Sequence, residues 1–245
     1  MFVFDSNYLL LVFIPTIIIS LLAQMYVRSQ FSKWGNTRNG SGLTGAQVAQ
    51  RIIDRTPVGD VGFAAADPRR QMAGASGISL ERTAGAFTDH YDPRTHTVRM
   101  SEEVASKPSV AAMAVVAHEL GHAQQHEENS VLIQMRNFLL PAVSLSPQIA
   151  FGLIFAGLIF RFSGLLWLGI IFFGLTVLFA VLTLPVEFDA SRRGMILLEQ
   201  AGLMNTAEDR GAQQVLTAAG LTYVAAAVTA VLQLLYYISL AQRRN

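Results

Sequence analysis

The sequence predicts a mainly α-helical integral membrane protein, in which four transmembrane helices carry an α+β domain inserted between helices 1 and 2. Three observations support this fold class. The 245 residues are 52% hydrophobic and only 14% charged, with a mean hydropathy of +0.40, which is too apolar for an ordinary soluble domain. Four stretches are apolar and long enough to cross a bilayer. The largest polar region lies between the first two of these stretches.

Residues 8–27 form the first predicted span, because this run carries no charge and is long enough to cross a membrane. A secretory signal peptide is the alternative interpretation. However, residues 1–7 contain no lysine or arginine, and no small-x-small cleavage site follows the run. We therefore expect a retained anchor.

Residues 28–137 form the predicted inserted domain. Thr44 and Gln47 are spaced as in a capping box, which predicts a short helix from Gly45 to about Arg55. The segment 57–77 is rich in glycine, alanine and proline and is expected to be irregular.

Two short strands are predicted in the second half of this domain. Residues 78–82 and 97–101 alternate in polarity, as half-buried strands do. The segment 87–96 between them is rich in turn-forming residues and predicts a hairpin.

The segment His118-Glu119-Leu120-Gly121-His122 matches the pattern H-E-x-x-H, on a helix predicted over about 108–127. Residues four apart share one face of an α-helix, so His118 and His122 direct two imidazoles at a common point, as a tetrahedral zinc ion requires. Glu119 is offset, which suits a general base acting on metal-activated water. The pattern fixes only three positions, so it also occurs by chance. The alternative is a packed helix whose two histidines are hydrogen-bonded within the protein and bind no metal.

Three further spans are predicted at 141–160, 165–184 and 221–240. The polar segment 185–220 separates the last two and is predicted to form two helical pieces, with Gly202 after the first and Thr206 as the N-cap of the second.

Composition restricts the ligands and partners. A net charge of +1 gives no reason to expect a nucleic-acid partner. The chain has no cysteine, so a metal must be held by histidine, aspartate or glutamate. His126 lies on the same helical face as His118 and His122, but three successive turns spread their side chains over about 12 Å, so we expect His126 at the rim of the site.

Glu187 is the predicted third ligand, because a peptidase zinc ion needs three protein ligands and one open position. The metzincin pattern is excluded, since Gln125 stands where it needs glycine and Glu128 where it needs histidine. Two spans lie between His122 and Glu187, so both residues are predicted on the same side of the membrane. The alternative for Glu187 is an interfacial acidic residue at a helix start, where the helix dipole favours it.

The distribution of basic residues predicts that the metal site faces the cytoplasm, following the positive-inside rule. The residues that flank spans on the side of the site are Arg28, Lys33, Arg38, Arg136, Arg192, Arg193 and Arg210. Those on the opposite side are Arg161, Arg243 and Arg244.

The sequence resembles the bacterial membrane-bound neutral zinc metallopeptidases, the YugP-like family, over nearly its whole length. Four blocks carry this resemblance, namely Gly42–Ala49, Thr88–Thr95, Ser109–His126 and Leu184–Arg193. The family implies four spans, zinc and endopeptidase activity.

The chain is more distantly similar to the HtpX and CAAX prenyl protease group of gluzincins, whose second motif reads E-x-x-A-D. Glu187 and Ala190 match this motif, but Ser191 stands where the aspartate belongs. That aspartate usually orients a zinc-binding histidine, so either Asp189 or Ser191 replaces it, or the histidine is held differently.

Together these features predict a membrane-anchored, multi-pass zinc-dependent endopeptidase of the cell membrane, with a gluzincin-like domain and one zinc ion per chain. Its expected substrates are peptides or proteins, including membrane proteins cut near the lipid surface. Tyr91, His90 and His126 are candidates for an additional oxyanion donor. Residues 97–101 are a candidate strand for holding the substrate backbone, and an ordinary structural strand is the equal alternative.

Two other function classes are alternatives, and a third alternative lies within the peptidase class. A zinc-binding scaffold or adaptor without turnover has no need of a base, so Glu119 argues against it. A channel or carrier is disfavoured because the predicted span interiors contain no ionisable residue. An intramembrane protease is disfavoured because a polar stretch, 127–137, separates the motif from the next span.

The predicted orientation can be tested by converting Ser41 to cysteine in this cysteine-free chain. A membrane-impermeant thiol reagent should leave this cysteine unlabelled in intact cells and label it after the membrane is opened. Labelling in intact cells would refute the cytoplasmic orientation.

Overall fold

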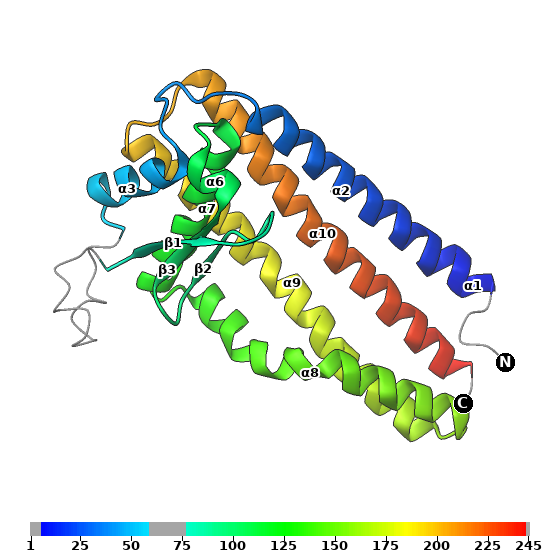
Figure 1. The fold of residues 1–245 in the computed structure, drawn as a ribbon. Coiled ribbons are helices and arrows are strands. Elements are labelled where there is room, and N and C mark those ends of the chain that lie inside the picture. Colours follow the sequence, from blue (N-terminus) through cyan, green and yellow to red (C-terminus); the bar gives the residue numbers. More distant parts are fainter. Residues whose placement is uncertain (1–5, 59–76, 244–245) are drawn as a thin grey trace. The chain divides into compact units, whose positions relative to one another are not determined.

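The computed structural model describes residues 6–58 and 77–243 (Figure 1). The fold is mainly helical, with four long apolar helices, one of them near the N-terminus, and a small mixed three-stranded sheet. The predicted fold class is therefore confirmed. Most of the segment predicted to be irregular, 57–77, lies outside the described residues.

The long helices are continuous elements that extend beyond the apolar runs. The N-terminal helical stretch comprises α1 (Ser6–Tyr8), the π-helical turn η1 (Leu9–Phe13) and α2 (Ile14–Gly35). The other three are α8 (Val131–Ile159), α9 (Ser163–Gln200) and α10 (Thr206–Gln242). All four stretches are long and apolar enough to span a membrane.

The shorter elements lie between α2 and α8 in the chain. They are α3 (Gly45–Arg55), β1 (Ser79–Thr83), β2 (His90–Asp92), β3 (Thr97–Ser101), α6 (Glu102–Ser106) and α7 (Val110–Glu127). The predicted capping box is confirmed, because the Thr44 hydroxyl accepts from the Gln47 backbone while the Gln47 side chain accepts from the Thr44 backbone. The face of α3 that carries Val48 and Ile52 is fully buried.

The break between α9 and α10 has the predicted C-terminal glycine but a different N-cap. Gly202 has a φ of +68°, in the left-handed region that glycine adopts without strain. The Asn205 side chain, one residue earlier than predicted, accepts from the backbone N–H groups of Ala207 and Glu208 at 3.1 Å each. Thr206 is thus the first helical residue, and its prediction as the N-cap was wrong.

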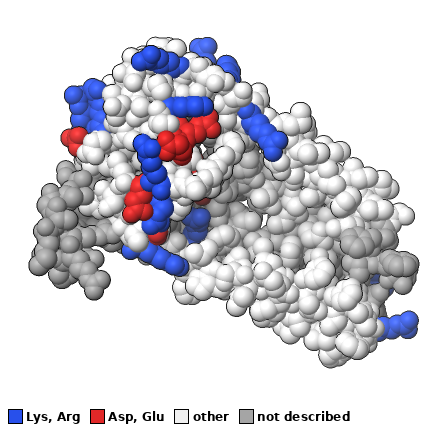
Figure 2. All heavy atoms as spheres, in the orientation of Figure 1, with Lys and Arg blue, Asp and Glu red and all other residues white. Residues whose placement is uncertain are grey.

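The chain divides into two compact units, which we describe separately. The apolar unit contains the described residues up to Met25, then Gln134–Pro185 and the described residues from Gly220 onward. The polar unit contains Tyr26–Ile133 and Val186–Ala219. Figure 2 shows the charged side chains gathered over the polar unit, whereas the visible surface of the apolar unit carries few charges.

Helices in the apolar unit approach one another at small residues. A Cβ atom built at Gly157 would lie 2.6 Å from the Leu166 backbone nitrogen, and one at Gly169 would lie 2.7 Å from Ile154. Small residues at such crossings are typical of membrane helices, which associate through close packing rather than through the hydrophobic effect. Tyr8 adds a hydrogen bond to Gln233 of α10.

The sheet of the polar unit has the strand order β1-β3-β2, with β1 parallel and β2 antiparallel to β3. The predicted hairpin is confirmed by the pairing of Tyr91 with Val98. Because β3 (97–101) is paired on both sides, it cannot accept a substrate strand, and its prediction as the substrate-binding strand was wrong. Strand β2 lies at an edge of this described sheet and contacts α7.

Two glycines bring the backbones of α7 and α9 into contact. A Cβ atom at Gly121 would lie 2.3 Å from the Ala190 carbonyl oxygen. Reciprocally, a Cβ atom at Gly194 would lie 2.7 Å from the Ala117 carbonyl oxygen. Neither position can hold a larger side chain without separating the helices, so both glycines are needed for this helix spacing.

We expect Gly194→Ala to destabilise the fold and weaken metal binding, because overpacking of a tight contact costs about 1–3 kcal/mol and moves α9 away from α7. Thermal unfolding in detergent and zinc content after dialysis would measure both effects. Gly174→Ala is a matched control on the same helix, since a Cβ atom there meets nothing within 4 Å. Equal behaviour of the two variants would contradict the packing argument.

Candidate metal centre

His118, His122 and Glu187 come together in the polar unit, from α7 and α9. The Nε2 atoms of His118 and His122 lie 3.4 and 3.5 Å from Glu187 Oε2. One ligand atom from each of the three residues lies within 4.8 Å of the others. The two imidazole rings are nearly perpendicular, with centroids 4.7 Å apart. The structure thus brings together the three residues expected to bind the metal.

The arrangement fits a zinc ion in distance and chemistry. Tetrahedral zinc with bonds of about 2.0–2.2 Å places neighbouring ligand atoms about 3.4 Å apart. Glu187 is 3% exposed, and its Oε2 atom makes no hydrogen bond within the described part of the chain. A buried carboxylate oxygen without a hydrogen-bond partner is costly, and a cation would compensate it.

Electrostatics keep Glu187 charged at this position. Burial alone would raise its pKa, but the favourable interaction with the neighbouring His118 and His122 imidazoles holds the pKa well below its ordinary value. A deprotonated carboxylate is the form that binds zinc.

Each histidine is oriented through its other ring nitrogen. His118 Nδ1 lies 3.1 Å from the Ser191 hydroxyl, and His122 Nδ1 lies 3.0 Å from Gln125 Oε1. These contacts leave both Nε2 atoms directed at Glu187. Of the two residues expected to replace the missing aspartate, Ser191 is thus the one that contacts His118.

Gln125 connects His122 to α9. Its amide nitrogen donates to the Val186 carbonyl and to Asp189 Oδ2, at 2.9 Å each, which directs the amide oxygen toward His122. Burial raises the pKa of Asp189, but hydrogen bonds from Gln125, Arg192 and Arg193 outweigh it and lower the pKa to about 2. Asp189 thus acts on the site as a charged group through Gln125.

Glu119 is held apart from the three-residue cluster by strand β2. Its Oε2 atom accepts a hydrogen bond from the Tyr91 backbone N–H at 2.8 Å, and the residue is 8% exposed. Because the Tyr91 N–H is directed at Glu119 rather than at β3, the edge of the sheet fixes the orientation of this carboxylate.

A buried polar network anchors the side chain of Tyr91. Its hydroxyl lies 2.6 Å from His96 Nδ1 and 3.1 Å from His126 Nδ1. His96 Nε2 lies 3.1 Å from Glu127 Oε1, and both of these side chains are 1% exposed. Burial lowers the pKa of His126, and the neighbouring His96 lowers it further. His126 therefore belongs to this network rather than to the three-residue cluster.

Gln125, His96 and Glu127 are the residues of this centre that sequence reasoning missed. Gln125 was considered only as a mismatch to the metzincin pattern. Its signal was its position three residues after His122, where side chains on a helix meet. No local pattern connects His96 to Glu127, since they contact through the tertiary fold. His90, an oxyanion candidate, is exposed and bonds through Nδ1 to the Thr88 carbonyl at 2.7 Å.

Comparison with known proteins agrees with this geometry. The family model described as "putative neutral zinc metallopeptidase" matches residues 9–72 and 62–242. The chain belongs to this family. It is 36% identical, over 220 residues and 90% of each chain, to the "putative membrane protease YugP" of Bacillus subtilis (strain 168). No solved structure matches the chain. Membership implies a zinc cofactor and peptide or protein substrates, and the four candidate spans imply a membrane location.

We expect Gln125→Met to weaken zinc binding by about 10–100-fold, the usual effect of removing a partner that orients a metal-binding histidine. Competition with a chromophoric chelator would measure the affinity. Gln124→Met is the matched control, because this neighbour on α7 makes no side-chain hydrogen bond within the described residues. Equal affinity in both variants would show that Gln125 does not support His122.

Proposed function

We propose that the protein is a membrane-anchored zinc-dependent endopeptidase of gluzincin type. In this proposal His118, His122 and Glu187 hold one zinc ion per chain. The observation that carries the proposal is the convergence of a buried, unpartnered carboxylate oxygen on two imidazole nitrogens, with a second carboxylate held beside it.

Glu119 is the general base. When bound, zinc supplies a Lewis acid that lowers the pKa of water from 15.7 toward about 7. Glu119 takes the proton as the water oxygen attacks the peptide carbonyl, and it returns that proton to the leaving nitrogen. The hydrogen bond from the Tyr91 N–H holds the carboxylate in place before the reaction, which reduces the reorganisation needed during it.

The edge of β2 replaces β3 as the strand proposed to hold the substrate. Among the described strands, β2 pairs on one side only, with β3. An extended peptide laid along its other side would run past Glu119, where its main chain would share the Tyr91 N–H with the Glu119 carboxylate. Because such binding contacts the main chain of the substrate rather than its side chains, it would accept peptides of many sequences.

The substrates are peptides or proteins, including membrane proteins cut close to the lipid surface. Glu187 follows the third predicted span, 165–184, by only a few residues in the same helix. We also propose that the site faces the cytoplasm, on the distribution of basic residues. The alternative function is a zinc-binding scaffold that does not cleave peptides. A scaffold would not need a carboxylate held in a fixed orientation beside the metal site, as Glu119 is.

Glu119→Gln should retain zinc and lose peptide cleavage by about 10²–10⁴-fold, because it removes the proton acceptor and keeps the metal-binding side chains. His118→Ala should lose both zinc and cleavage. Metal analysis of the purified full chain, together with zinc-dependent hydrolysis of a peptide mixture, would measure these effects.

Two outcomes would contradict the proposal. Wild-type cleavage by Glu119→Gln would exclude this residue as the base. Zinc binding by the wild-type protein without cleavage of any peptide in the mixture would favour the scaffold.

A further inference from the structure

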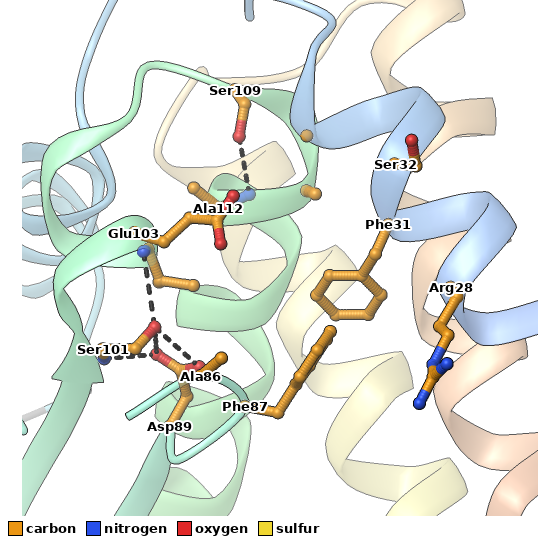
Figure 3. Close-up of a pocket in the computed structure, with 13 residues that line it drawn as sticks. Arg28, Phe31, Ser32, Ala86, Phe87, Asp89, Ser101, Glu103, Ser109 and Ala112 are labelled. Atoms are coloured by element: carbon orange, nitrogen blue, oxygen red, sulfur yellow. Dashed lines mark hydrogen bonds between the residues drawn. The ribbon is translucent and has the colours of Figure 1, made fainter. Parts of the chain in front are cut away.

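A second feature of the polar unit is a pocket of about 230 Å³ next to the N-terminal half of α7 (Figure 3). Its walls are largely apolar. Ala111 and Ala112 of α7 form one side, Val104 of α6 another, and the rings of Phe31 and Phe87 close it. The volume is below the about 300–1,000 Å³ typical of sites for whole small molecules, so it suits a single side chain.

The pocket continues the candidate active site along α7. Ala112 precedes Glu119 by seven residues, which is two helical turns and places both on one face about 10.5 Å apart. Strand β2 follows the same course, because Tyr91 contacts Glu119 while Asp89, two residues earlier, lines the pocket. The helix and the strand therefore both lead from the base to the pocket.

Phe87 is held in an unfavourable conformation at this pocket. Its φ of +59° lies in the left-handed region, which bulky residues rarely adopt, and the residue is 64% exposed. Its ring meets that of Phe31 edge to face, with centroids 5.1 Å apart. Figure 3 shows the two rings directed toward each other from α2 and from the loop before β2. Strained residues of this kind concentrate at ligand-binding sites.

The walls of the pocket favour an aromatic occupant over a charged one. Asp89 accepts from the Ser101 backbone at 2.7 Å and from the Ser101 hydroxyl, and Glu103 pairs with Lys107 at 2.6 Å. Arg28 also lines the pocket and makes no hydrogen bond or ion pair within residues 6–58 and 77–243. A lysine or arginine side chain here would lose the hydration of its charge between Arg28 and the Asp89 carboxylate, whereas an aromatic ring would meet other aromatic rings.

We propose that this pocket is a specificity subsite that binds an aromatic side chain of the substrate, about three residues from the cleaved bond. The inference rests on the proposed peptidase function. An extended chain advances about 3.3 Å per residue, so three residues cover the distance from Glu119 to Ala112. Since β2 runs from the pocket toward Glu119, an antiparallel substrate strand runs the opposite way, and the aromatic residue lies C-terminal to the cleaved bond.

Mass spectrometry of the products first locates the cleaved bond in a peptide substrate. The test then uses the zinc-loaded full chain and matched peptides that carry phenylalanine, alanine or lysine at the third position after that bond. The phenylalanine peptide should have a kcat/KM at least about tenfold above the alanine peptide, with lysine lowest, given the discrimination usual for apolar pockets. Ala112→Leu should fill the pocket and abolish this preference. Phe87→Ala, at an exposed position, should reduce it without endangering the fold.

Thr217→Leu is the matched control, because it adds the same kind of side chain to a different groove between α9 and α10. It should keep the preference for phenylalanine. An equal rate for the three peptides with the wild-type protein would overturn the subsite. So would an unchanged preference in both pocket variants, with folding checked by thermal unfolding.

A binding experiment separates this inference from the proposed function. In the Glu119→Gln background, fluorescence anisotropy with the same labelled peptides should show tighter binding of the phenylalanine peptide, and Ala112→Leu should remove the difference. Selective binding without zinc-dependent cleavage by the wild-type protein would reject the peptidase and keep the pocket. Cleavage without selectivity in either assay would reject the pocket and keep the peptidase.

Discussion

The close contact between α7 and α9 is the constraint on which the candidate metal centre depends. Each helix supplies part of the ligand set, and neither part can bind zinc tightly alone. Gly121 lies inside the H-E-x-x-H motif and Gly194 lies two turns beyond Glu187, and each lets the partner backbone approach where a side chain would block it. A methyl group at either glycine would increase the distance between α7 and α9 and move the Glu187 carboxylate away from both imidazoles. The motif therefore contains a packing residue as well as the proposed ligands and the proposed base.

Buried polar groups around the centre are satisfied by one another, which gives the site a defined geometry before any metal binds. Ser191 and Gln125 each orient one histidine, and Gln125 is itself held by α9. A buried polar group that loses its partner costs about 1–3 kcal/mol, so alternative rotamers of these side chains are disfavoured. Within the described residues, the Glu187 Oε2 atom next to the histidines is the buried polar atom of this centre that has no hydrogen-bond partner. A bound cation would compensate its negative charge.

Sequence reasoning predicted what depends on local spacing and missed what depends on tertiary contact. The four apolar helices, the capping box at Thr44 and the pair of histidines follow from periodicity within one segment. Glu187 was predicted from the metal's need of a third ligand and from its position just after the third span, and the even number of spans before it agreed with that choice. By contrast, the central position of β3 depends on a parallel partner, β1, that no hairpin pattern reveals. The Tyr91–His96–His126 network joins two separate elements, so its members could be listed but not connected.

Strand β2 links the chemistry to substrate binding. Its backbone fixes Glu119, its edge away from β3 is the one proposed to receive a peptide, and its first residues follow directly from the pocket. The His96–Glu127 pair lies beneath this strand and anchors it through the Tyr91 hydroxyl. A peptide that displaced β2 would therefore also displace the base, whereas one that added to its edge would meet the base already in position. In the proposed binding mode, this coupling would favour extended, unfolded substrate segments over folded ones, because only an extended chain can follow the strand.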